Sequence, residues 1–131
     1  MDFSGFTGEV QHRLELGTQG EAVRATRAAL QTLAERLHEG EATDLAGPLP
    51  MEIDWYLESA DHGQRFDWDE FVDRVGERAG VEESDAVFYA QAIVALVGDL
   101  VPGSELDDVR NGLPGEFDAL FELVGEEEAF D

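Results

Sequence analysis

The chain has 131 residues, no cysteine and a formal net charge of −23, because 31 acidic residues oppose eight basic ones. The missing cysteines exclude disulfides, thiolate metal sites and cysteine nucleophiles. The few basic residues, all arginine, disfavour direct binding to DNA or RNA, since basic contacts with phosphate supply most non-specific affinity.

Apolar spacing and capping residues predict the first two helices. Apolar side chains recur every three to four residues over residues 3–14, and Asp2 or Ser4 can cap this helix. A second helix is predicted to start after Thr18, whose side chain opens a capping box, and to stop near Gly40.

Two shorter helices are predicted to follow. Residues 41–46 form a helix that ends at Gly47-Pro48, and Pro50 starts another that runs through Leu57. Residues 59–65 are polar and form a connector to the second half of the chain.

The second half predicts the same succession of helices. Asp67 caps the first of them, and an apolar run over residues 86–101 forms the longest. Ser104 is expected to cap a short helix, and Pro114 opens a last one that reaches about Val124. No segment shows the sustained two-residue alternation of a strand, so the predicted fold class is all-α.

The two halves of the chain resemble each other. Residues 1–16 align with residues 66–81, and residues 22–57 align with residues 86–121 once a single residue is omitted. The matched pairs include cap, core and turn residues: Asp2 with Asp67, Phe6 with Phe71, Val10 with Val75, Arg13 with Arg78, Pro50 with Pro114. Agreement in the order of such positions indicates an internal repeat.

We therefore expect a single domain over residues 1–131. Repeat 1 covers about residues 1–58, the connector residues 59–65 and repeat 2 about residues 66–124, with an acidic tail at 125–131. Each repeat contains three to four helices, and the two repeats are expected to pack as a helical bundle about a pseudo-twofold axis.

Over residues 1–124 the chain resembles the bacterial and archaeal family catalogued as domain of unknown function 2267. The resemblance lies in the Phe-x-x-x-Val pattern of both first helices, the run from Arg27 to Leu37, the segment 40–45 and both Leu-Pro pairs. It implies no catalytic residue, because the family label assigns no activity. Members from ordinary habitats are less acidic, which implies that the charge reflects habitat.

The acidity has two interpretations. Such a charge destabilises a compact chain at ordinary ionic strength, but the Debye length is only about 3 Å in 1 M salt, so molar KCl screens neighbouring carboxylates. The composition therefore favours the cytoplasm of a salt-accumulating haloarchaeon. The alternative is an acidic mimic of nucleic acid that binds a DNA-binding protein.

We expect a cytoplasmic protein without a membrane span. The chain begins at Met1 without the basic segment and cleavage site of a signal peptide. Its most apolar stretch, residues 86–101, is interrupted by Gln91, Gly98 and Asp99 and falls short of the roughly 20 apolar residues that a spanning helix needs.

Residues that could carry chemistry show no known arrangement. The histidines, His12, His38 and His62, lack the four-residue pairing of zinc sites, which favours surface positions. The serines fall at predicted caps or in the connector, outside any Gly-x-Ser-x-Gly motif. We therefore expect no catalytic, metal or cofactor site and favour a non-enzymatic interaction or structural module. An enzyme whose site is hidden among the carboxylates is a third hypothesis.

Aromatic residues that differ between the repeats are the candidate interface. Four of them align with small, aliphatic or charged residues of the other repeat: Trp55, Tyr56, Phe88 and Tyr89. They can fill the seam between the repeats, or they can bind a partner helix or a second copy of the chain.

Overall fold

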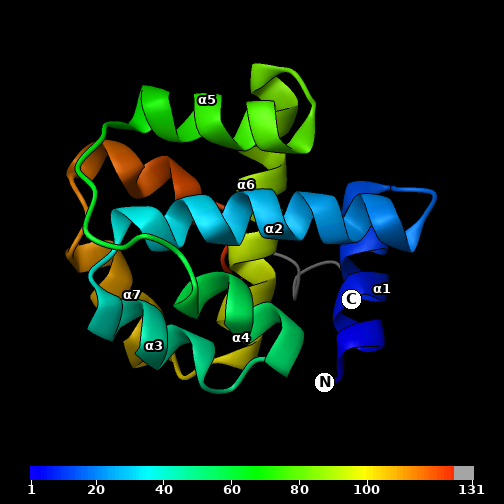
Figure 1. Ribbon diagram of the computed structural model, residues 1–131, viewed down its shortest axis with the longest axis horizontal. Helices are drawn as coiled ribbons and strands as arrows, with labels where there is room; N and C mark the ends of the chain where they lie inside the picture. The colour runs from blue at the N-terminus through cyan, green and yellow to red at the C-terminus, as the bar shows by residue number, and fades with distance from the viewer. Residues whose placement is uncertain (126–131) are drawn as a thin grey trace.

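The computed structural model describes residues 1–125, and in this part of the chain seven α-helices and one 3-10 helix follow one another without a strand (Figure 1). The elements are α1 (Phe3–Leu14), α2 (Gln19–Arg36), α3 (Glu39–Ala46), α4 (Met51–Glu58), α5 (Trp68–Ala79), α6 (Glu83–Leu100), α7 (Gly103–Asn111) and η1 (Gly115–Phe121). The predicted all-α fold class is confirmed. Most of the predicted acidic tail, from residue 126 on, lies outside the described residues.

Side-chain caps start three of the helices as predicted. The Asp2 carboxylate accepts the backbone N–H of Gly5 at 2.8 Å, and the Asp67 carboxylate accepts that of Glu70 at 2.9 Å. The Thr18 hydroxyl accepts the N–H of Glu21 at 3.1 Å. Each cap satisfies a donor that the first helical turn leaves without a partner.

Helix α2 ends at Arg36 rather than near Gly40, so the predicted end was wrong. The chain turns extended at Leu37, where the connector supplies hydrogen bonds to the last carbonyls of the helix. The N–H of Gly63 donates to the Leu37 carbonyl and that of Gln64 to the Glu35 carbonyl, both at 2.8 Å. A tertiary contact therefore replaces further helical turns.

Two boundaries in the second half also differ from prediction. Helix α7 is preceded by Pro102, so Ser104 lies inside its first turn instead of capping it. The last helix is a 3-10 helix that ends at Phe121 rather than near Val124. Its three-residue period places Phe117 and Leu120 on the buried side.

The two 18-residue helices organise the packing. Helix α2 crosses the middle of the molecule and packs on α1, α4, α5 and α6, while α6 passes behind it and packs also on α1, α5 and η1 (Figure 1). Their buried side chains join one hydrophobic cluster with the remaining helices. Within residues 1–125, no helix is both long and apolar enough to cross a membrane.

Candidate functional site

The structure divides each predicted aromatic pair. Trp55 on α4 is 59% exposed and Phe88 on α6 is 43% exposed, whereas Tyr56 and Tyr89 are partly buried against the hydrophobic cluster. In each pair, one ring therefore contributes to the packed interior and its neighbour faces outward. The proposal that these residues bind a partner stays a prediction.

The two exposed rings belong to different surfaces. Helix α4 packs on α1, α2 and α3, while the first turns of α6 lie beside α5. In Figure 1, α4 is at the bottom of the molecule and α6 begins at the top. The predicted residues therefore do not form one continuous patch.

Sequence comparison missed a residue beside Trp55. Met51 precedes Trp55 by one helical turn and is 83% exposed, the highest value among the large apolar side chains of the described residues. Residues four apart share a helix face, so the two side chains form one apolar surface, which we call the α4 surface. Both the i, i+4 spacing and the comparison of the two halves of the sequence could have identified Met51, because the alignment places it opposite Gly115.

Carboxylates flank both aromatic surfaces. On α4, a hydrogen bond to Asp54, repulsion by its charge and burial together raise the pKa of Glu58. On α6, burial and the nearby charges of Asp85 and Glu21 raise the pKa of Tyr89. A partner that binds either aromatic surface therefore contacts negative charge at the edge of that surface.

A buried ion-pair cluster joins α2 to α5. Glu35 is almost fully buried, and its carboxylate accepts hydrogen bonds from Arg74 at 3.1 Å and from both Nη atoms of Arg78 at 2.8 and 3.0 Å. Burial opposes the charge of Arg74, but hydrogen bonds to Glu70 and Glu35 raise its pKa. This cluster fixes the position of α5 on α2.

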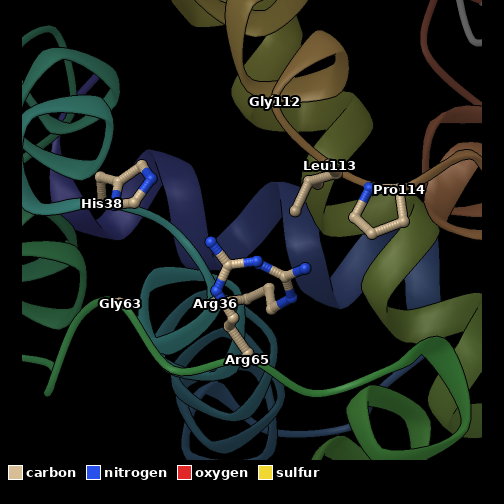
Figure 2. Close-up of a pocket in the computed structure, with 7 residues that line it drawn as sticks. All are labelled: Arg36, His38, Gly63, Arg65, Gly112, Leu113 and Pro114. Atoms are coloured by element: carbon tan, nitrogen blue, oxygen red, sulfur yellow. The ribbon is translucent and has the colours of Figure 1, made fainter.

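Four of the eight arginines make no ion pair within the described residues, although the chain carries 31 acidic residues. They are Arg24, Arg27, Arg36 and Arg65. Arg24 and Arg27 line a cavity of about 460 Å³ along α2. Arg36 and Arg65 line a second cavity of about 240 Å³ with His38 and the turn at residues 112–114 (Figure 2). We call the second one the Arg36–Arg65 cavity.

Sequence reasoning missed the Arg36–Arg65 cavity. The two arginines are 29 positions apart in the sequence, and no spacing rule brings them together. They meet because the connector folds back onto the end of α2 through the hydrogen bonds of Gly63 and Gln64. The one indication of an anion site in the sequence is its composition, because every basic residue is arginine, the side chain best suited to bind oxyanions.

The three histidines occupy separate places. His12 and His38 are exposed, and the Nε2 atom of His62 lies 2.7 Å from the Leu57 carbonyl oxygen. Within residues 1–125, no group of three or more His, Cys, Asp or Glu side chains is arranged to hold a metal ion.

These features define an all-helical protein with a strongly acidic composition, an exposed apolar helix face and an arginine-lined cavity. The chain belongs to the family described as uncharacterized conserved protein (DUF2267), whose model matches residues 3–120. A comparison with curated proteins found no match.

Proposed function

We propose that this protein is a non-enzymatic binding module of a haloarchaeal cytoplasm and that the α4 surface contacts its protein partner. The observation that carries the proposal is the exposure of Met51 and Trp55 on one face of a short, well-anchored helix. Tryptophan is enriched among residues that dominate binding energy, and methionine adapts its shape to a partner.

The α4 surface is rigidly supported from beneath. Ile53 and Leu57 on the opposite face of α4 are fully buried, and Tyr56 packs its ring edge-on to Trp55 with centroids 6.3 Å apart. A rigid surface loses less conformational entropy on binding than a flexible one. Phe88 has less exposed area and is the weaker candidate.

Affinity capture in molar KCl tests the proposal with matched variants. The bait is the full chain, the test variant is Met51→Ser with Trp55→Ser, and the control is Phe88→Ser on the other surface. We expect a specific protein to be retained by wild type and by the control and lost with the α4 variant. Retention by the α4 variant, with helix content unchanged, would overturn the assignment.

Direct contact can be checked with the purified partner. Trp68 is partly buried and Trp55 is exposed, so Trp68→Phe leaves Trp55 as the only tryptophan. Burial of Trp55 by the partner should shift its fluorescence to shorter wavelength. An unchanged spectrum in a formed complex would place the contact elsewhere.

We infer further that the chain consists of two repeats related by a pseudo-twofold axis. Arg13 on α1 pairs with Asp99 on α6 at 2.9 Å, and Arg78 on α5 pairs with Glu35 on α2. The sequence alignment matches Arg13 with Arg78 and Glu35 with Asp99. Reciprocal pairs of this kind are expected when each first helix crosses to the long helix of the other repeat.

The left-handed residue after each first helix also supports this inference. Glu15 and Gly80 are aligned in the two repeats, and both have positive φ, at 54° and 73°. Positive φ is uncommon for a residue other than glycine. The same turn therefore forms in both halves, even where the sequence does not favour it.

The nucleic-acid mimic is the second candidate, and an uneven charge distribution favours it. Helices α3 and α4 carry several carboxylates and no arginine, whereas α2, the connector and α5 hold six of the eight arginines. If α3 and α4 imitate a phosphate backbone, duplex DNA should compete with this protein for its partner. Capture that DNA does not reduce would reject the mimic.

A further inference from the structure

We propose that the Arg36–Arg65 cavity is a binding site for a compact phosphate group, either inorganic phosphate or a small phosphate monoester. The carrying observation is the convergence of two arginine side chains that make no ion pair with any residue of the described part of the chain, although the net charge is −23. Figure 2 shows both side chains reaching into the space between His38 and the Leu113-Pro114 turn.

The Arg36 guanidinium is held in place with donors to spare. Its Nε atom donates to the Phe66 carbonyl at 2.9 Å, and its Cζ atom lies 5.5 Å from the centre of the Phe117 ring. Within residues 1–125, its Nη atoms make no hydrogen bond to the protein. The group is therefore oriented by the fold while its outer edge can still bind a ligand.

The path of the connector places Arg65 beside the cavity. Gly63, in a left-handed conformation with φ of 83°, and Gln64 are both hydrogen-bonded to the end of α2, and Arg65 follows directly. Arg65 is exposed and makes no hydrogen bond or ion pair with the described residues. The backbone hydrogen bonds of Gly63 and Gln64 therefore position Arg65 beside Arg36, and no ion pair with a described carboxylate holds it there.

Electrostatics favours an anion in this place. Two guanidinium groups that share a cavity repel each other, and among residues 1–125 no carboxylate is close enough to either of them to form an ion pair. The carboxylate of Glu41 on α3 lies beside Gly112, which lines the cavity, and accepts the backbone N–H of His38 at 3.3 Å. An oxyanion between the arginines would remove the repulsion and accept charge-assisted hydrogen bonds from both.

The dimensions and chemistry select the class of ligand. Pockets for drug-sized molecules are typically about 300–1,000 Å³, so a cavity of about 240 Å³ suits a smaller ligand than a nucleotide. The planar donors of arginine match phosphate oxygens, and the exposed His38 ring can add a donor. Leu113 and Pro114 cover one side with apolar atoms, which favours a compact group over an extended chain.

Calorimetric titration of the full chain in molar KCl tests the site. The probes are inorganic phosphate and glycerol phosphate in separate arms, with potassium sulfate as the divalent competitor. Tighter binding of glycerol phosphate identifies a monoester as the ligand, and tighter binding of phosphate identifies the free ion. Equal binding of sulfate, or no heat with any probe, would overturn the proposal.

Variants locate the binding. Arg65→Gln should weaken binding by about 10- to 100-fold, the range expected for loss of a charge-assisted hydrogen bond. Arg65 is exposed and makes no hydrogen bond or ion pair with the described residues, so we expect the variant to fold. Arg27→Gln removes the same charge from the other cavity and should leave binding unchanged. Loss of binding with Arg27→Gln but not with Arg65→Gln would contradict the assignment. Phosphorus NMR line broadening provides a second measurement on the same samples.

Discussion

Arg78 reaches from α5 to α2, where both of its Nη atoms donate to the Glu35 carboxylate. Arg74 donates to the same carboxylate, and the Thr32 hydroxyl accepts from Arg78 at 2.9 Å. One acidic side chain therefore links α5 to α2 across the contact between the first half of the chain and the second.

Glu35→Gln should lower the free energy of unfolding by about 1.5 to 3 kcal/mol, because it weakens several hydrogen bonds to charged groups and leaves two arginines without their carboxylate. Asp99→Asn is the matched control at the Arg13 pair, where a smaller loss of about 1 kcal/mol is expected because the Asp99 carboxylate is more exposed than that of Glu35, 27% against 9%. Urea unfolding in molar KCl measures both. Equal losses of unfolding free energy in the two variants would show that the burial of Glu35 does not strengthen its ion pairs.

Thr26→Val should stabilise the protein by about 1 kcal/mol. The Thr26 side chain is fully buried, and its hydroxyl has no hydrogen-bond partner within residues 1–125, so its removal avoids a desolvation cost. Thr32→Val is the matched control, because the Thr32 hydroxyl donates to the Ala28 carbonyl at 2.7 Å and accepts from Arg78. Opposite shifts in melting temperature are expected, and shifts of the same sign would contradict this account.

Glu15→Gly should also stabilise the fold, by up to about 1 kcal/mol. Left-handed backbone costs other residues roughly 1–2 kcal/mol relative to glycine, and the greater freedom of glycine in the unfolded chain offsets part of the gain. Glu15→Gln removes the same charge and keeps the strained backbone, so it isolates the conformational effect. If both variants gain equally in thermal unfolding, the effect is one of charge.

Glu58 should titrate above its ordinary value of 4.5, because Asp54 raises its pKa by hydrogen bonding and repulsion. Between the unfolded and folded pKa values the folded state binds more protons, so this group's contribution to stability falls as the pH rises through that window. Carbon-detected NMR titration follows Glu58, and Asp54→Asn should lower its pKa. An unchanged value would exclude the coupling.

Salt should stabilise the whole fold. Raising KCl from about 0.1 M to about 3 M shortens the Debye length below the separation of most carboxylates, which weakens the repulsion within a chain of net charge −23. Circular dichroism should record more helix and a sharper, higher-temperature transition. Equal thermal stability at both concentrations would reject adaptation to a salt-rich cytoplasm.

Local signals in the sequence predicted the helices well. Asp2, Thr18 and Asp67 cap helices where the capping patterns placed them, because these hydrogen bonds involve residues only three apart. The end of α2 was mispredicted because its last carbonyls bond to Gly63 and Gln64, a contact made by distant parts of the chain.

The same distinction applies to the candidate sites. Comparing the two halves of the sequence identified Trp55 and Phe88 as unusual, and both are exposed. The Arg36–Arg65 cavity escaped detection because it forms only when the connector folds onto α2. The periodicity of apolar residues predicts individual helices, but it does not predict the path of an irregular segment such as the connector.

The crossing of α5 onto α2 bears on the origin of the chain. If the two halves descend from one duplicated gene, the ancestral half-length chain had an α2 face that its own helices could not cover. A homodimer in which the first helix of each subunit also packs on the long helix of the other would cover that face. Fusion of two copies would then have made that dimer permanent and allowed one half to acquire a connector arginine that the other lacks.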